Sequence, residues 1–171
     1  MSAVERKEFT FAVVTMSDKG SRGEREDTSG AYLREKLAGE GYTPVYYTII
    51  PDSIPVIVST LKDLADEGRT ALVVTTGGTG VAPTDVTPEA MLEVIEREIP
   101  GMAEAMRFES LKKTPNAVLS RGKAGIRGRT LIINLPGSLK AVKENLEVLL
   151  PVLPHALEKI RGDEGDCGKA D

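Results

Sequence analysis

The amino-acid sequence predicts an α/β fold built around a mostly parallel sheet. Short apolar runs alternate with longer stretches of helical character, which is the pattern of right-handed βαβ units. Three of the four strand-like runs are nearly all apolar, as expected for strands that helices cover on both faces. A length of 171 residues fits one domain of this kind.

The four expected strands are rich in β-branched residues and bounded by polar or turn-forming residues. Pro44 falls near the start of the second strand, where a missing backbone donor is tolerated. The strands cover residues 9–15, 42–50, 69–75 and 129–135.

Helices are expected where apolar residues recur at helical spacing and capping residues stand at the ends. Thr28 or Ser29 would cap the first helix, which the glycines after residue 37 would end. Ser138 would cap the helix that follows the last strand. Further helices are expected over residues 54–67, 88–95, 102–111 and 152–161, and loops over residues 16–27 and 81–87.

The net charge of −4 argues against a general affinity for nucleic acid or for a membrane surface. Residues 1–8 lack the apolar core of a signal peptide, and no apolar run reaches the ~18 residues that a membrane span needs. We therefore expect a cytoplasmic protein. Residues 1–163 are expected to form a single domain and residues 164–171 a flexible polar tail.

One stretch, the basic segment of residues 107–129, departs from this acidic balance, with Glu109 as its only acidic residue. A local basic segment in an acidic protein suits an anionic small molecule, although an ordinary solvated surface is the alternative. Its basic side chains are Arg107, Lys112, Lys113, Arg121, Lys123, Arg127 and Arg129.

Neither the single cysteine nor the single histidine indicates a catalytic group. Cys167 falls in the polar tail, without a second cysteine or a nearby histidine, so neither a metal site nor a nucleophile is expected there. His155 lies beside leucines in the last helix and is expected to be structural. Nothing in the spacing resembles a Ser-His-Asp arrangement.

The most unusual residues of the sequence follow the strands directly. In open α/β sheets, ligands bind outside the carboxyl ends of the strands, so these residues are expected to meet in one site. They are Ser17 and Asp18 after the first strand, Asp52 after the second, residues 76–80 after the third and residues 134–137 at the end of the fourth.

The segment TTGGTG, residues 75–80, is the most informative of these. Its glycines allow a backbone with positive φ, and successive amides in such a turn form an anion-binding nest. It is neither a P-loop nor a dinucleotide fingerprint, because the lysine of the first and the glycine spacing of the second are missing. A plain structural turn is the alternative interpretation.

Two aspartates at this edge of the sheet predict a metal site. Asp85 comes shortly after the glycine loop, and Asp52 stands at an equivalent strand end, so together they could hold Mg²⁺ against triphosphate oxygens. Alone, Asp85 is typical of a helix cap and Asp52 of a turn residue. Ser110, Ser120 and Arg121 could supply hydroxyl and guanidinium contacts to phosphate. These residues favour phosphoryl or nucleotidyl transfer, which depends on positioning, metal and charge neutralisation.

Five motifs in order resemble the MogA/MoaB family. They are TMSD at residues 15–18, IIPD at 49–52, TTGGTG at 75–80, DVTPE at 85–89 and INLPG at 133–137. The stretches at residues 119–133 and 149–163 look especially like the G domains of gephyrin-type molybdenum-cofactor proteins. The similarity extends over residues 9–163, nearly the whole chain.

This resemblance implies a three-layer αβα sandwich that binds molybdopterin and assembles as a homotrimer. It implies a molybdopterin adenylyltransferase, which uses Mg²⁺ and ATP to adenylylate the molybdopterin phosphate and releases pyrophosphate. A downstream metal-insertion protein would be a further partner. On the family pattern, Asp52 and Asp85 are the essential aspartates and the Mg²⁺ ligands. The family pattern also implies a nucleotide and phosphate site at Gly77, Gly78, Gly80, Asn134, Pro136 and Gly137, and a molybdopterin side at Ser110 and Ser120. By their own positions and chemistry, Ser17, Asp18, Thr76 and Thr79 are further candidates for the nucleotide and phosphate, and Arg121 for molybdopterin.

Two alternatives stay open. The motif DTSG, residues 27–30, is shared with the MoaB branch, some members of which look inactive, so the chain could be a non-catalytic molybdopterin carrier. A CinA-like enzyme that acts on nicotinamide nucleotides is less favoured, because such proteins usually carry a second domain.

Overall fold

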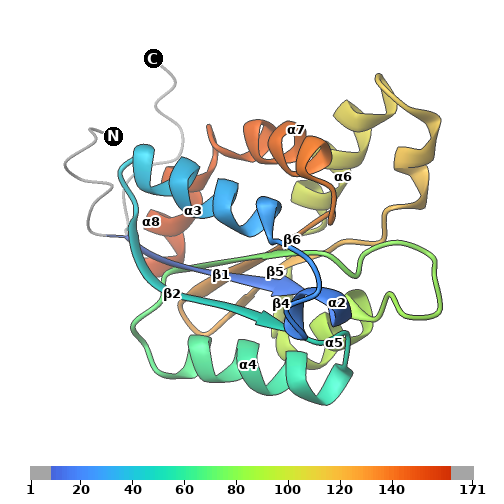
Figure 1. Cartoon of the computed structure of the whole chain (residues 1–171). Coiled ribbons are helices and arrows are strands. Elements are labelled where there is room, and N and C mark those ends of the chain that lie inside the picture. The colour runs from blue at the N-terminus through green and yellow to red at the C-terminus, as the bar shows by residue number, and fades with distance from the viewer. Residues whose placement is uncertain (1–8, 163–171) are drawn as a thin grey trace.

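The computed structural model describes residues 9–162, which form a six-stranded sheet with helices on both faces (Figure 1). The strands are β1 (Thr10–Met16), β2 (Thr43–Ile50), β3 (Leu72–Thr76), β4 (Arg97–Glu98), β5 (Ala124–Arg127) and β6 (Thr130–Leu135). Their order across the sheet is β2-β1-β3-β6-β5-β4. The neighbouring strands β2, β1, β3 and β6 run parallel to one another, whereas β5 is antiparallel to β6 and β4 is antiparallel to β5. The predicted mostly parallel α/β fold is confirmed.

The helices form two layers around the sheet, so the three-layer arrangement is also confirmed. One face is covered by α4 (Ile54–Asp66) and α5 (Thr87–Val94), below the sheet in Figure 1. The other face is covered by α3 (Thr28–Gly39), α6 (Pro100–Leu111), α7 (Leu139–Leu149) and α8 (Leu153–Arg161). The short helix α2 (Asp18–Ser21) follows β1, and the 3₁₀ helix η1 (Pro115–Leu119) follows α6.

The alternation of side chains along the strands builds a separate core on each face. In β1, Phe11 and Val13 belong to the core beneath α3 and α7, whereas Val14 belongs to the core against α4 and α5. In β6, Ile133 and Ile132 divide between the two cores in the same way. All five side chains are buried, which explains why these strands read as nearly continuous apolar runs.

The winding of the chain reverses between β1 and β3. The connection through α3 lies on one face of the sheet, and the connection through α4 lies on the other. The loops that leave β1 and β3 therefore diverge, which opens a crevice at the carboxyl ends of these strands. The sequence motifs that follow β1 and β3 border this crevice.

Two strands lie outside the predicted set. β5 falls in the basic segment and contains only four residues, and β4 has two exposed residues, so neither shows an apolar strand pattern. Both form because β5 pairs with β6 and offers its other edge to β4. At the opposite edge, β2 is largely exposed, unlike β1, β3 and β6.

The start of α3 differs from the prediction that Thr28 or Ser29 caps it. The N-cap is Asp27, whose carboxylate accepts a hydrogen bond from the amide of Gly30 at 2.8 Å. Thr28 and Ser29 already lie inside the helix, where they cannot satisfy its first free amides. The prediction was therefore wrong by one or two residues, although the motif itself does begin the helix.

Serines cap two of the other helices. The predicted loop after β1 contains α2, which Ser17 caps by accepting a hydrogen bond from the amide of Gly20 at 2.9 Å. Ser138 caps α7, as predicted. The predicted tail and Cys167 lie outside the described residues. Within residues 9–162, none of the helices is long and apolar enough to cross a membrane.

The core against α4 can be tested with Leu61, whose side chain is fully buried. Leu61→Ala is expected to lower the free energy of unfolding by about 2–5 kcal/mol, because it removes buried contacts and leaves a cavity. Val56 of the same helix is 37% exposed, so Val56→Ala should change it by about 0.5 kcal/mol or less. Urea unfolding followed by circular dichroism measures both, and equal effects would contradict this packing.

Candidate active site

Two adjacent cavities open at the carboxyl ends of the parallel strands, around the point where the winding reverses. Each has a volume of about 460 Å³. The first cavity is bordered by the ends of β1 and β3 and the start of α3, and the second by α6, η1 and α7. Gly78, Asp85 and Gly137 line both cavities and form the wall between them.

The first cavity is polar and mostly acidic. Four carboxylates contribute to its lining, whereas Arg25 is the only basic residue among those that line it. The acidic residues are Glu26, Asp27, Asp52 and Asp85. An anion can bind in such a place only together with a cation or with backbone amides that offset the charge.

The second cavity combines polar and apolar side chains. Arg107, Ser110 and Ser120 contribute polar groups, and Val81 and Leu119 contribute apolar surface. Ser110 donates a hydrogen bond to the side chain of Asn145 at 3.3 Å, which fixes its hydroxyl at the cavity edge. A cavity of this composition suits a small molecule with an apolar body and several polar groups.

The loop after β3 can lie against the end of β1 because its first residues lack side chains. Gly77 and Gly78 have φ angles of 99° and 69°, in the left-handed region that favours glycine. A Cβ on Gly77 would lie 2.4 Å from the carbonyl oxygen of Met16, and one on Gly78 would lie 3.1 Å from the carboxylate of Asp52. The amide of Gly77 donates to the carbonyl of Leu135 at 3.1 Å. The glycines thus join the ends of β1, β2, β3 and β6 into one site.

Asp52 and Asp18 are joined by two reciprocal hydrogen bonds. The amide of Asp52 donates to the carboxylate of Asp18 at 2.9 Å, and the amide of Asp18 donates to the carboxylate of Asp52 at 3.2 Å. Burial raises the pKa of the Asp52 carboxyl above its usual value; the Asp18 amide opposes this rise, and the charges of Asp18 and Asp85 add to it. Negative charge is therefore concentrated where the first cavity meets the wall.

Asp85 is held in that wall by its own loop and by Arg121. Its carboxylate accepts a hydrogen bond from the amide of Ala82 at 3.0 Å. The guanidinium of Arg121 donates to the carbonyl oxygens of Gly80 at 2.8 Å and of Asp85 at 2.7 Å. It also pairs with Glu89 and holds the pKa of that carboxyl below its usual value. Arg121 therefore clamps the loop that carries Asp85 and lines neither cavity.

Asp27 ties the start of α3 to β1 and β2. Its carboxylate accepts hydrogen bonds from the hydroxyls of Thr15 and Tyr47, each at 2.6 Å. Burial and this carboxylate raise the pKa of Tyr47 to about 12, so the phenol remains a donor at neutral pH. Arg34 lies over the ring of Tyr47, 4.3 Å from its centre.

The DTSG motif thus has a role beyond the helix cap that its sequence suggests. Ser29 donates a hydrogen bond to the carbonyl of Gly137 at 2.9 Å, which fixes the shared wall against α3. Gly30 is required because a Cβ there would lie 2.0 Å from the carboxylate of Asp27. Sequence reasoning missed this role because the partner residues are distant along the chain.

The residues predicted to bind nucleotide or molybdopterin separate into two groups. Thr76 lines the first cavity, but its hydroxyl donates to the carbonyl of Pro136 at 2.7 Å and shapes the loop. Asn134 is buried and bonds to Thr75 and to the amide of Lys123. Those that line a cavity are Ser17, Asp52, Thr76, Gly77, Gly78, Thr79, Gly80, Asp85, Ser110, Ser120, Pro136 and Gly137. Those that line neither are Asp18, Arg121 and Asn134.

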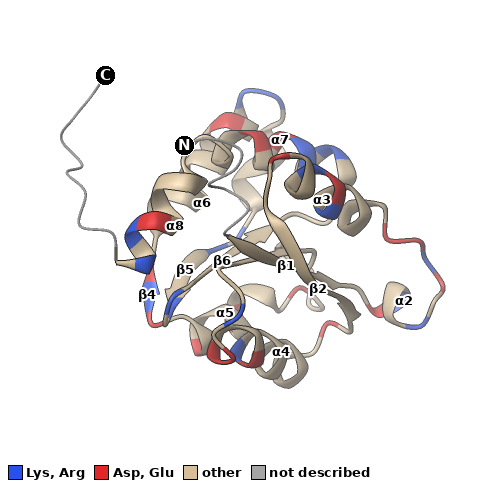
Figure 2. Ribbon diagram, turned by 90° about the vertical axis from the view of Figure 1, so that its left-hand side faces the viewer, with Lys and Arg blue, Asp and Glu red and all other residues tan. Residues whose placement is uncertain are grey.

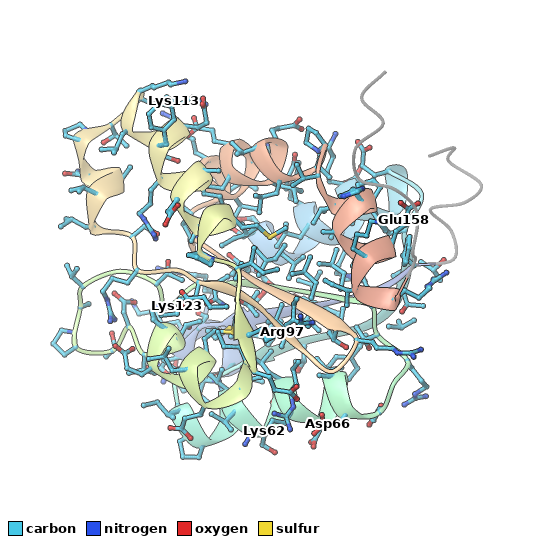
Figure 3. All side chains as sticks on the ribbon, turned by 180° about the vertical axis from the view of Figure 1, so that it is seen from behind. Lys62, Asp66, Arg97, Lys113, Lys123 and Glu158 are labelled. Carbon is cyan, nitrogen blue, oxygen red and sulfur yellow. The ribbon has the colours of Figure 1, made fainter. Side chains whose placement is uncertain are left out.

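The basic segment does not gather around the site. Lys113 and Lys123 pair with acidic side chains, and they lie in different parts of the molecule in Figure 3. The guanidinium of Arg127 donates two hydrogen bonds to the carboxylate of Asp66, at 2.8 and 2.9 Å, and this bidentate pair connects β5 to α4. Of the segment, Arg107 alone lines one of the two cavities with a basic side chain. Figure 2 shows charges of both signs spread over the outer helices. The solvated-surface interpretation fits the exposed Lys112, Lys113 and Arg129, whereas Arg107, Arg121 and Arg127 are half-buried and hydrogen-bonded within the fold.

The fold and the cavities define a doubly wound α/β protein with an acidic cavity at its switch point. Residues 12–155 match a family model described as a probable molybdopterin binding domain. The chain is 44% identical over 155 residues to a molybdopterin adenylyltransferase of Helicobacter pylori, and the match covers 90% of this chain and 88% of that protein. The chain belongs to this molybdopterin-binding family.

Solved structures agree with this assignment. The molybdopterin biosynthesis enzyme MoaB from Thermus thermophilus superposes with a TM-score of 0.85 at 53% identity, over 91% of this chain and 98% of that one. The tungsten cofactor synthesizing protein MoaB from Pyrococcus furiosus gives a TM-score of 0.82 at 39% identity, over 90% and 97% of the two chains.

The clamp formed by Arg121 can be tested without any ligand. Arg121→Ala is expected to speed amide hydrogen exchange over residues 80–86 by about tenfold or more, because bonds from a charged donor contribute about 1.5–3 kcal/mol. Arg127→Ala is the matched control, since it removes the two hydrogen bonds that another arginine of the basic segment donates to Asp66, away from residues 80–86. Unchanged exchange over residues 80–86 in Arg121→Ala would contradict the clamp.

The electrostatic state of Asp52 gives a second test. Because folding raises its pKa, the folded protein loses stability as pH rises from the usual pKa of aspartate through the raised value. Asp52→Asn removes this loss, so the metal-free variant should be more stable than the wild type at pH 7. The difference in stability should be smaller at about pH 3.5, near the usual pKa of aspartate. The exposed Asp63, as Asp63→Asn, is the control. Urea unfolding at the two pH values measures the difference, and a stability loss at pH 7 would refute the electrostatic argument.

Proposed function

We propose that the protein transfers the adenylyl group of ATP to the phosphate of molybdopterin and releases pyrophosphate. The observation that carries this proposal is the wall shared by the two cavities. Because Gly78, Asp85 and Gly137 border both, ligands bound on either side would meet there. Relatives that are 44% and 47% identical to the chain and are named molybdopterin adenylyltransferases support the same reaction.

The chemistry of each cavity suits one substrate. The acidic first cavity would hold the magnesium complex of ATP, with its α-phosphorus at the wall. The second cavity would hold molybdopterin, with Ser110 and Ser120 bonding to its polar groups and Leu119 packing against its ring system. Arg107 is the basic side chain in that cavity that can attract the molybdopterin phosphate.

The reaction is an in-line displacement at the α-phosphorus. An oxygen of the molybdopterin phosphate attacks, a new oxygen–phosphorus bond forms, and the bond from the α-phosphorus to the bridging oxygen breaks. The bridging oxygen keeps the bonding electrons and leaves as part of pyrophosphate. The glycine loop lines the cavities at Gly78 and Gly80, and its amides would stabilise the charge on the transferring group. Positioning and electrostatics provide the catalysis, as in other phosphoryl-type transfers.

Asp52 and Asp85 would hold Mg²⁺ in this reaction. The half-buried carboxylate of Asp52 has a raised pKa and two further carboxylates nearby, and a bound dication would offset this concentration of negative charge. Within residues 9–162 no cluster of three or more metal-ligating side chains is found. Mg²⁺ commonly takes one or two carboxylates and completes its shell with phosphate oxygens and water, so Asp52 and Asp85 would be enough ligands from the protein. When bound, the ion would offset part of the negative charge of the triphosphate.

The expected assembly, location and partner of the protein come from the same family pattern. We expect a homotrimer in the cytoplasm that passes its product to a metal-insertion protein. Exposed apolar side chains on α6 and η1, Phe108 and Val118 among them, support self-association. A relative named for tungsten cofactor synthesis and relatives named for molybdenum are both similar to this chain, so either metal is compatible with the proposal.

Asp52→Asn and Asp85→Asn are each expected to lower adenylylation by at least about a hundredfold, because each removes a charge that positions the metal and the triphosphate. The purified protein is incubated with Mg-ATP and molybdopterin, and pyrophosphate and adenylyl-molybdopterin are measured together. Asp63→Asn is again the control, and circular dichroism reports the fold.

Three other results would each change the conclusion. Full activity in both variants would refute the role of the aspartates. Molybdopterin binding without pyrophosphate would make the protein a carrier. Neither binding nor turnover would show that the ligands themselves are wrongly assigned.

A further inference from the structure

The first cavity has few positive charges for a ligand as anionic as ATP. Its lining contains four carboxylates and a single basic side chain, that of Arg25. An ATP triphosphate carries about four negative charges at neutral pH, of which one Mg²⁺ offsets two. In the proposed reaction the amides of the glycine loop would serve the α-phosphate at the wall, so the charge at the far end of the triphosphate needs another partner.

Arg25 stands on a loop that is fixed at both ends. The loop, residues 22–27, joins α2 to α3 and carries several charges (Figure 2). Its start is held by the amide of Glu24, which donates to the carbonyl of Lys19 at 2.9 Å, and its end by the side-chain hydrogen bonds of Asp27. The backbone thus places Arg25 at the cavity, and its side chain is exposed.

The guanidinium of Arg25 is available for a ligand. Among residues 9–162, it forms neither a hydrogen bond nor an ion pair. Its neighbour Arg22, on the same loop, is instead engaged by Glu24 at 2.9 and 3.0 Å and does not line the cavity. Arg107, the basic residue of the second cavity, is already bonded to the carbonyls of Ser120 and Gly122.

We infer that Arg25 binds the β- and γ-phosphates of Mg-ATP and the pyrophosphate that they become. This inference rests on the proposed function for the nucleotide, but not on the identity of the acceptor. As the bond between the α-phosphorus and the bridging oxygen breaks, negative charge grows on that oxygen and spreads over the leaving pyrophosphate. A planar guanidinium can hold two phosphate oxygens at once and stabilise this charge. Arg25 is therefore assigned to leaving-group stabilisation, separate from the metal.

Binding measurements with three probes test the inference. Isothermal titration calorimetry gives the affinities of Mg-ATP, Mg-pyrophosphate and AMP for the wild type, Arg25→Ala and Arg22→Ala. Arg25→Ala is expected to weaken Mg-ATP and Mg-pyrophosphate about ten- to a hundredfold, the range for a charged hydrogen-bond donor. AMP lacks the β- and γ-phosphates, so its affinity should not change and also reports an intact fold. Arg22→Ala should match the wild type with all three probes.

The possible outcomes separate this inference from the proposed function. Wild-type affinity of Arg25→Ala for Mg-pyrophosphate would overturn the inference and leave the adenylylation proposal standing. Equal weakening of AMP and ATP would also overturn it, because Arg25 would then contact the nucleoside or the α-phosphate, which both ligands share. If the wild type binds Mg-ATP and Mg-pyrophosphate but does not adenylylate molybdopterin, the proposed reaction fails, and a selective loss in Arg25→Ala still supports the inference. If the wild type binds no probe, both are overturned.

Discussion

The close contact between the glycine loop and the end of β1 is the constraint on which the site depends. Gly77 packs its α-carbon against the carbonyl of Met16, and Gly137 in turn lies against Gly77. A side chain at Gly77 would push the loop away from β1 and separate the strand ends. The contact brings Asp52 from one strand end beside Gly78 from another, and it sets the thickness of the wall between the two cavities. The rest of the site is built outward from this wall.

The second constraint is electrostatic. Burial is the largest cause of the raised pKa of Asp52; the charges of Asp18 and Asp85 add to the rise, and the hydrogen bond from the amide of Asp18 opposes it. The fold tolerates the arrangement because the surrounding loops are fixed by other contacts, among them the Arg121 clamp and the Asp27 network. Stability is reduced locally at a place where a metal–nucleotide complex would restore it, which is common at functional sites.

The sequence was sufficient for the α/β fold, and most of its candidate residues lie at the strand ends where the two cavities open. The strands at β1, β3 and β6 and their glycine and aspartate ends carry local patterns that need no knowledge of the partner residues. The missing parts are those that depend on distant contacts. β5 exists because β6 pairs with it, and Arg121 resembles a phosphate ligand until its acceptors, the carbonyls of Gly80 and Asp85, are known. Arg25 is a further example, since nothing near it in the chain reveals that its loop borders the first cavity.

The shared wall has a consequence for the fate of the product. Adenylyl-molybdopterin joins two moieties that the two cavities would hold separately, so the product would be bound at both ends by one protein. When one moiety detaches, the moiety that is still bound holds the detached one at a high effective concentration near its own cavity. Rebinding of the detached moiety would then be faster than escape of the product. Dissociation, rather than bond formation, would then limit the turnover of the isolated protein. A partner that withdraws either moiety would speed release, so transfer between two proteins would be faster than loss to solution.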